Sequence, residues 1–282
     1  DGTLKEPVLL PATFPNIIIN PNQGIAVGMA SNICSFNLQE VCEATVQLIN
    51  DENVDLLKYI KAPDFATGGS LIFNEREIRD IYRTGRGGFK VRAKYQFDKK
   101  NNCIEIIEIP YTTTTEAIME AIIALVKTGK IKDITDIRDE TDLDGLKITI
   151  DVKKNTDADD LMNKLYKLTP LEDTFSCNFN ILVKGYPKVM GVRQILKEWI
   201  SFRIDCIKRL TLFDIEKKSE KLHLLLGLQK ILLDIDKAIK IVRNTEQDSE
   251  VIPNLMKAFE IDNIQAEFVA EIKLRNLNKR YI

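Results

Sequence analysis

The chain has 282 residues, of which 44% are apolar and 29% are charged, a composition typical of a folded protein with a sizeable core. Forty basic and 42 acidic residues give a net charge of −2, which excludes a uniformly basic nucleic-acid binder but allows local basic surfaces. No apolar run approaches the roughly 20 residues of a membrane-spanning helix. We therefore expect a cytoplasmic protein without a membrane partner.

The extended segment 1–36 opens the chain. It carries prolines at every fourth position from Pro7 to Pro15, which a helix interior does not tolerate. Ile17–Ile19 predicts a short buried strand, and the small residues of Gly24–Ala30 allow close backbone approach. The first residues carry neither an initiator Met nor a signal pattern, so we expect a piece of a longer protein.

Residues 37–187 predict an α+β domain. Capping residues place helix starts at Asn37, Asn74, Thr113 and Asp157. Alternating apolar residues predict strands over 89–97, 104–109 and 146–152.

Residues 188–243 predict one long helix of about 50 residues, because no proline lies between Pro187 and Pro253. Apolar residues step by threes and fours from Val192 to Val242 and form a single seam, which requires a partner helix. Short helices are expected over 252–280.

Cysteine and histidine do not form a metal or disulfide pattern. The five cysteines are scattered without a CxxC motif, which favours a reducing compartment. The single histidine, His223, lies in a leucine-rich helical run, where a structural role is expected. Residues 140–151 approximate a calcium loop, but the strand that follows favours an acidic hairpin turn instead.

Basic residues gather between positions 83 and 100, where seven Lys and Arg side chains accompany one acid, Asp98. A flexible glycine turn next to a Lys/Arg strand face can follow the phosphates of a nucleic acid. The alternative is an ordinary solvated strand face. The DNA-binding candidates in this region are Arg83, Arg86, Lys90, Arg92 and Lys94.

Two segments carry a family resemblance, Glu6–Asn16 (EPVLLPATFPN) and Met29–Leu38 (MASNICSFNL). Both resemble the A subunit of bacterial type IIA topoisomerases, the gyrase and topoisomerase IV family. The similarity continues in Pro63–Gly69, Tyr82–Gly87, Glu108–Tyr111, Asp136–Asp142, Asn163–Lys167 and Leu274–Leu277.

The resemblance implies an α+β tower domain, a long coiled-coil helix and a small all-α dimerisation gate. In this sequence we expect the end of a winged-helix region with a DNA-wedge loop at 1–36, the tower at 37–187, the coiled-coil helix at 188–243 and a truncated gate at 244–282. No tyrosine has the Arg-Tyr-Thr context of the family nucleophile, so no catalytic residue is expected. The resemblance places Mg²⁺ and ATP in a partner B subunit.

The resemblance also implies a DNA wedge at Ile33, with Asn32 beside it. An apolar side chain inserted between base pairs costs a few kcal/mol of unstacking but bends the duplex onto more protein surface. Cys34-Ser35-Phe36 replaces the Pro-Pro-His of the family pattern, which removes rigidity from this loop. The alternative is that Ile33 is a core residue.

Three hypotheses of function follow. The first is the DNA-bending and protein-gate part of a type IIA topoisomerase A subunit, nearer to topoisomerase IV than to gyrase. In this hypothesis two A subunits form a homodimer, which binds B subunits to give an A2B2 complex. The complex acts on double-stranded DNA and is associated with the nucleoid. The second is a non-enzymatic, DNA-binding coiled-coil protein. The third is a nucleotide-binding enzyme that uses the glycine loops at Gly24–Gly28 and Gly85–Gly88. The ordered motifs favour the first.

Overall fold

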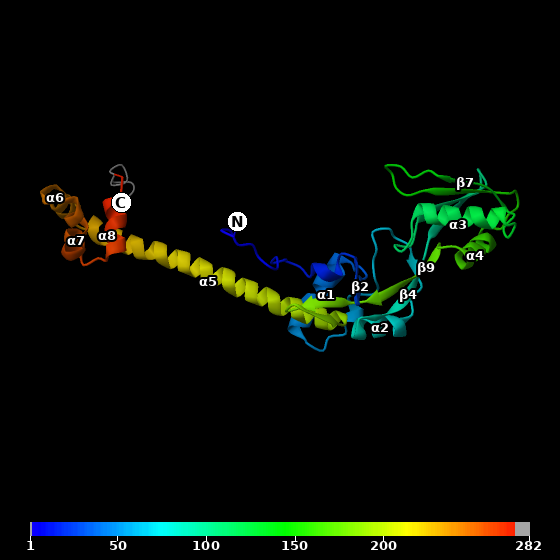
Figure 1. Cartoon of the computed structure of the whole chain (residues 1–282), viewed down its shortest axis with the longest axis horizontal. Coiled ribbons are helices and arrows are strands. Elements are labelled where there is room, and N and C mark those ends of the chain that lie inside the picture. Colours follow the sequence, from blue (N-terminus) through cyan, green and yellow to red (C-terminus); the bar gives the residue numbers. More distant parts are fainter. Residues whose placement is uncertain (1, 274–282) are drawn as a thin grey trace. The chain divides into compact units, whose positions relative to one another are not determined.

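The computed structural model describes residues 2–273, which divide between Arg203 and Ile204 into two compact units, called unit 1 and unit 2. Strands and helices alternate up to residue 189, and only helices follow (Figure 1). The predicted order of an α+β part before an all-α part is therefore confirmed. None of the described helices is long and apolar enough to cross a membrane.

The first sheet of unit 1 has five strands in the order β1-β2-β9-β4-β3, with antiparallel pairing throughout. These strands are β1 (Asn22–Ala26), β2 (Met29–Ile33), β3 (Ser70–Leu71), β4 (Arg86–Arg92) and β9 (Glu172–Asn178). Strand β2 meets β9 at one residue pair, Asn32 and Asn178. The rest of the β1–β2 hairpin consequently extends beyond the sheet. A second hairpin follows β9, formed by β10 (Asn180–Val183) and β11 (Tyr186–Val189).

Two helices, α1 (Leu38–Asn50) and α2 (Glu75–Thr84), begin where their caps predict. The Asn37 side chain accepts hydrogen bonds from the N–H groups of Gln39 and Glu40, and Asn74 caps α2 in the same way. Gly85 ends α2 in the left-handed region at φ 71°, and a Cβ there would lie 2.2 Å from the Met190 carbonyl oxygen. Two 3₁₀ turns complete this part, η1 (Asn16–Ile18) and η2 (Leu56–Lys58).

One core joins the start of the chain to the sheet and helices. Ile18, Ile33 and Phe36 are buried together with side chains from α1, α2, β4, β9 and the first turns of α5. Phe36 makes edge-to-face contacts with Tyr82 and Phe179. Packing is therefore continuous across position 36, where the sequence suggested that one part ends.

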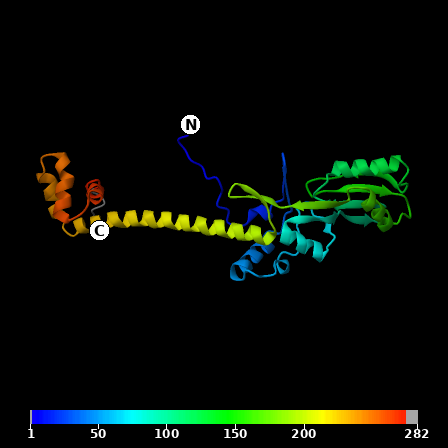
Figure 2. The ribbon, with the colours of Figure 1, turned by 60° about the horizontal axis from the view of Figure 1, so that its bottom comes forward.

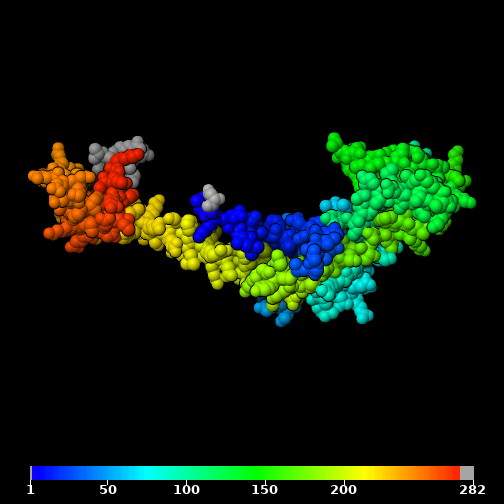
Figure 3. Space-filling view, viewed as in Figure 1, coloured from blue at the N-terminus to red at the C-terminus, as the bar shows by residue number. Residues whose placement is uncertain are grey.

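A second core lies in the four-stranded sheet of unit 1, whose order is β5-β6-β8-β7. Figure 3 shows this region as the green lobe. Within this core, Tyr166 donates a hydrogen bond to the Ala93 carbonyl oxygen. The elements are β5 (Lys94–Asp98), β6 (Cys103–Glu108), α3 (Thr115–Lys127), β7 (Ile134–Asp139), β8 (Ile148–Val152) and α4 (Ala158–Leu168).

The predicted strand over 89–97 has the expected alternation but belongs to two sheets. Phe89 and Val91 enter the first core and Ala93 the second. The acidic segment after β7 forms a hairpin turn with a bridge between Asp142 and Gly145, as predicted. No group of three or more metal-binding side chains occurs among residues 2–273.

Helix α5 (Val192–Leu232) has 41 residues and is followed after two residues by α6 (Ile235–Asn244). The prediction of one helix over 188–243 is therefore wrong. The Asp234 side chain accepts a hydrogen bond from the Lys237 N–H and starts a new helix. Such local capping competes with continuation of the preceding helix.

The prediction of a single apolar seam on this helix is also incomplete. Ile204, Ile215 and Leu222 are about half exposed. At about 100° per residue they lie roughly opposite Leu210 and Phe213, which belong to the predicted seam. Between residues 204 and 226, α5 thus exposes apolar side chains on two faces.

The end of α5 packs with three short helices in unit 2, α6, α7 (Asp248–Phe259) and α8 (Asn263–Ala270). Gly227 permits α8 to approach, because a Cβ there would lie 2.6 Å from Gln265 Cβ. His223 Nε2 pairs with Asp262 at 2.5 Å, so the expected structural role of this histidine is confirmed, although its side chain is 47% exposed. The predicted helical residues from 274 to 280 lie outside the described part.

Candidate nucleic-acid interface

The β1–β2 hairpin presents an uncharged apolar tip. Residues 7–39 contain no Asp, Glu, Lys or Arg. The two strands pair from Asn22–Ile33 to Ala26–Met29, and Gly28 completes the turn at φ 76°. Near this turn, Ile25 is 87% exposed and Val27 is fully exposed. Large apolar side chains on a projecting hairpin are suited to insertion into a partner rather than to the chain's own core.

Ile33 lies at the other end of β2 and has the opposite environment. Its side chain is 1% exposed and belongs to the first core. A side chain packed there cannot insert between base pairs without leaving the core. The expectation that Ile33 is the wedge is therefore corrected, and its burial supports the core alternative.

Asn32 belongs to a row of polar residues that crosses four strands. Its Cα is opposite Gln23 on one side and Asn178 on the other, and Asn178 is in turn opposite Arg86. Residues opposite one another in antiparallel strands project from the same face. The Asn32 amide donates a hydrogen bond of 2.6 Å to the Ser176 carbonyl oxygen, and Asn178 donates one of 2.7 Å to Ala30. These bonds fix the base of the hairpin next to Arg86.

Arg83 and Arg86 flank the Gly85 turn and are both exposed. Arg83 forms an ion pair of 2.9 Å with Asp80, but both side chains are more than half exposed, so solvent screens the pair. Arg86 has no recorded ion pair among residues 2–273. The two guanidinium groups therefore retain the capacity to bind phosphate.

Lys90, Arg92 and Lys94 are balanced by carboxylates from neighbouring strands. Lys90 pairs with Glu172 at 2.8 Å, and Arg92 bonds the same carboxylate. The hydrogen bond from Lys90, supported by Arg92, holds the pKa of Glu172 below its ordinary value. Lys94 pairs with Glu108 at 2.8 Å. Part of the charge predicted for DNA is therefore already compensated within the protein.

Two of the described tyrosines, Tyr82 and Tyr95, have surroundings that oppose ionisation of the hydroxyl. Burial raises the pKa of Tyr82, whose hydroxyl donates to the Ile60 carbonyl oxygen at 3.1 Å. Burial and the neighbouring Asp159 raise the pKa of Tyr95 as well. A nucleophilic hydroxyl requires a base or cation that lowers its pKa, so these environments act in the opposite direction.

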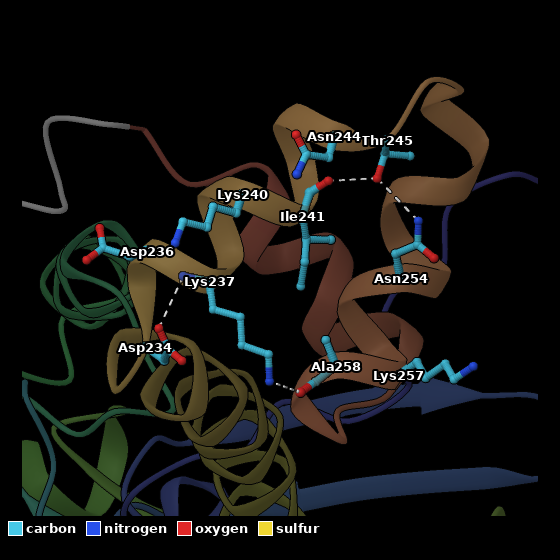
Figure 4. Close-up of a pocket in the computed structure, with 10 residues that line it drawn as sticks. All are labelled: Asp234, Asp236, Lys237, Lys240, Ile241, Asn244, Thr245, Asn254, Lys257 and Ala258. Carbon is cyan, nitrogen blue, oxygen red and sulfur yellow. Dashed lines mark hydrogen bonds between the residues drawn. The ribbon is translucent and has the colours of Figure 1, made fainter.

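A shallow pocket of about 870 Å³ lies in unit 2 between α6 and α7 (Figure 4). Lys237 Nζ donates to the Ala258 carbonyl oxygen at 2.9 Å, and Asn254 donates to Thr245 at 3.2 Å. These bonds satisfy carbonyl and hydroxyl groups at the ends of the helices. The lining is therefore engaged in holding α6 against α7, and we assign it no chemistry.

Sequence reasoning missed the exposed apolar tip at Ile25 and Val27 and the polar row at Asn178. The tip carried a readable signal, since Ile25 and Val27 directly precede the turn glycine Gly28 within a segment that has no charged residue. The polar row left no signal in the sequence, because Asn178 is 146 residues away from Asn32 along the chain and only the sheet register joins them.

The family model for the A subunit of DNA gyrase/topoisomerase IV matches residues 1–282. The DNA gyrase A subunit of Clostridium acetobutylicum is 41% identical over 98% of this chain, and that of Borreliella burgdorferi is 38% identical over 98%. These matches cover 34% and 35% of the two relatives, so the chain spans about a third of their length.

Proposed function

Because the chain belongs to the family of DNA gyrase/topoisomerase IV A subunits, we propose that it is the DNA-bending and protein-gate part of a type IIA topoisomerase. The complete enzyme would pass one duplex through a double-strand break in another, in an ATP-dependent reaction. The observation that carries the proposal is the projecting β1–β2 hairpin, with Ile25 almost fully exposed at its tip.

The hairpin supports DNA bending through an apolar wedge. Ile25 and Val27 would insert at a base step, where the cost of unstacking is offset by the contacts of a bent duplex. This assigns the wedge to the tip of the hairpin instead of to Ile33 at its base. Asn32 and Asn178 would hold the hairpin in register while the duplex presses on its tip.

Phosphate contacts would come mainly from Arg83 and Arg86. Arg86 begins β4 and shares the polar row with Asn32, and Arg83 lies in the last turn of α2, three residues before it. Lys90, Arg92 and Lys94 would contribute less, because binding phosphate requires that they first release Glu172 or Glu108. Contacts of this kind carry no base sequence information, so binding would be non-specific.

The remaining reactions would belong to partners. Mg²⁺ and ATP are assigned to a partner in this proposal, and residues 2–273 hold no group of three or more His, Cys, Asp or Glu side chains that could bind a metal ion. A B subunit would supply both in an A2B2 complex in the bacterial cytoplasm, and the helices of unit 2 would form the dimerisation gate. Topoisomerase IV rather than gyrase stays a prediction, and the relatives compared above carry the gyrase name. Negative supercoiling of relaxed plasmid by the complete enzyme would contradict it.

The test of the DNA interface is a salt-dependent binding measurement on the full-length protein. The double change Arg83→Glu and Arg86→Glu should weaken binding alike on unrelated duplexes and reduce the salt slope by about 2, at roughly 0.9 per lost phosphate contact. Lys127→Glu with Lys130→Glu, on the exposed end of α3, is the matched control. Unchanged affinity of the arginine variant in 50 mM salt would overturn the assignment.

A further inference from the structure

Two hairpins of unit 1 lie against each other and enclose a groove. Figure 2 shows both of them, β1–β2 in blue and β10–β11 in yellow-green, extending away from α1 and α2. Asn178 and Asn180 each donate a side-chain hydrogen bond to the Ala30 carbonyl oxygen, at 2.7 and 3.3 Å. The bases of the two hairpins are thus joined through the Ala30 carbonyl oxygen.

The groove between the hairpins has about 270 Å³ and an apolar lining. Ile25 and Met29 contribute from the first hairpin, and Leu182 and Pro187 from the second. Leu182 and Pro187 are opposite each other in the register, so both project from the face that meets the β1–β2 hairpin. Leu182 is nevertheless 68% exposed, and Tyr186 at the turn is 72% exposed. The chain leaves this surface uncovered.

The β10–β11 hairpin carries positive charge in addition to its apolar side chains. Lys184 lies in its turn and Lys188 on β11, and both are exposed. Neither has a recorded ion pair among residues 2–273, and positions 174–197 contain no Asp or Glu. Lys188 is opposite Ile181 in the register and therefore shares a face with Tyr186 rather than with Leu182. Together with Lys184 in the turn it gives an uncompensated positive surface, which is complementary to a polyanion.

We propose that the β10–β11 hairpin is a second DNA-binding arm that acts beside the β1–β2 wedge. Lys184 and Lys188 bind phosphates of the duplex next to the base step that Ile25 opens, and Tyr186, which shares a face of the hairpin with Lys188, packs against the sugar edges there. The arm thereby holds the backbone in place while the wedge unstacks the bases. This inference rests on the proposed DNA-bending function and adds a site to it.

The test compares duplex binding by the full-length protein with that of the double variant Lys184→Glu and Lys188→Glu. Loss of two phosphate contacts should reduce the slope of log K against log salt by about 2 and lower affinity about tenfold or more at 100 mM salt. Lys153→Glu with Lys154→Glu, in the exposed turn before α4, is the matched control and should leave both quantities unchanged. Equal melting temperatures of the variants and the wild type establish that folding is intact.

The outcomes separate this inference from the function on which it rests. If the wild type binds and bends DNA but the Lys184 and Lys188 variant has an unchanged salt slope, only the second arm is overturned. The groove would then be a candidate site for a protein partner. Failure of the wild type to bind or bend duplex DNA would overturn both the proposed function and the arm. A slope reduced in this variant, with bending still dependent on Ile25, would support both.

Discussion

At the scale of single residues, Ile25 and Ile33 show how position on one hairpin determines what an isoleucine does. They lie on the paired strands β1 and β2, yet one side chain is 87% exposed and the other 1% exposed. An exposed isoleucine contributes little to folding and remains available to a partner, whereas a buried one contributes several kcal/mol to stability. The functional role therefore follows exposure rather than residue type.

The core role of Ile33 predicts a large stability effect. Ile33→Ala should lower the free energy of unfolding by about 2–5 kcal/mol, because it removes buried methyl groups and leaves a cavity beside Phe36. Ile49 on α1 is 61% exposed, so Ile49→Ala should change the free energy of unfolding by less than about 0.5 kcal/mol. Urea unfolding of both variants measures the difference, and equal midpoints would contradict the burial of Ile33.

The ion pairs of Glu172 predict a pH dependence. Its carboxyl pKa is lowered in the folded protein, so the carboxylate stabilises the fold above its ordinary pKa, and this contribution is lost as the pH falls through the lowered value. Glu172→Gln should therefore lower the melting temperature at pH 7, and the gap to the wild type should close toward pH 3. Glu120→Gln, exposed on α3, is the control. A gap that stays constant with pH would show that charge is not the cause.

At the scale of elements, helix starts could be predicted from the sequence because they depend on local chemistry. Asn37, Asn74 and Asp157 cap the helices that they were expected to begin, and Gly85 ends α2. The start of α3 was predicted one residue too early, because its cap is Thr114 and not Thr113. The break between α5 and α6 was missed because it depends on the Asp234 cap and on the packing of α6 against α7, which apolar spacing does not reveal.

The cap of α1 predicts a moderate loss of stability. Asn37→Ala removes the acceptor for the N–H groups of Gln39 and Glu40 and should lower the free energy of unfolding by about 1 kcal/mol. Asn37→Ser keeps a capping oxygen and should restore most of it. Chemical unfolding compares the two variants, and an alanine variant as stable as the serine variant would exclude capping as the reason.

At the scale of the whole molecule, the two cores of unit 1 and the exposed faces of α5 were the least predictable features. Ile18 and Phe36 share a core with residues of β9 and α5 that lie far along the chain, and no local pattern records such pairings. The candidate site was recoverable only in part for the same reason. Its arginines belong to a local motif, whereas the hairpin and its partner Asn178 are joined by the sheet.

The exposed apolar faces of α5 predict self-association. Ile204, Leu210, Phe213 and Leu222 leave apolar surface exposed between residues 204 and 226, which favours pairing with another helix. Light scattering of the chain at about 50 μM should give at least twice the 32.2 kDa mass of one copy, with a tendency to larger species. A monodisperse monomer at that concentration would contradict the dimer.

The central claim is that the tip of the β1–β2 hairpin bends DNA. The most direct measurement is energy transfer between dyes on the two ends of a short duplex bound to the full-length protein, with Ile25→Ala compared against the control Ile49→Ala. Ile25→Ala should reduce the bend, while the melting temperature stays unchanged and phosphate-dependent affinity is largely kept, because Ile25 is exposed and uncharged. A bend that is the same in Ile25→Ala, Ile49→Ala and the wild type would contradict it.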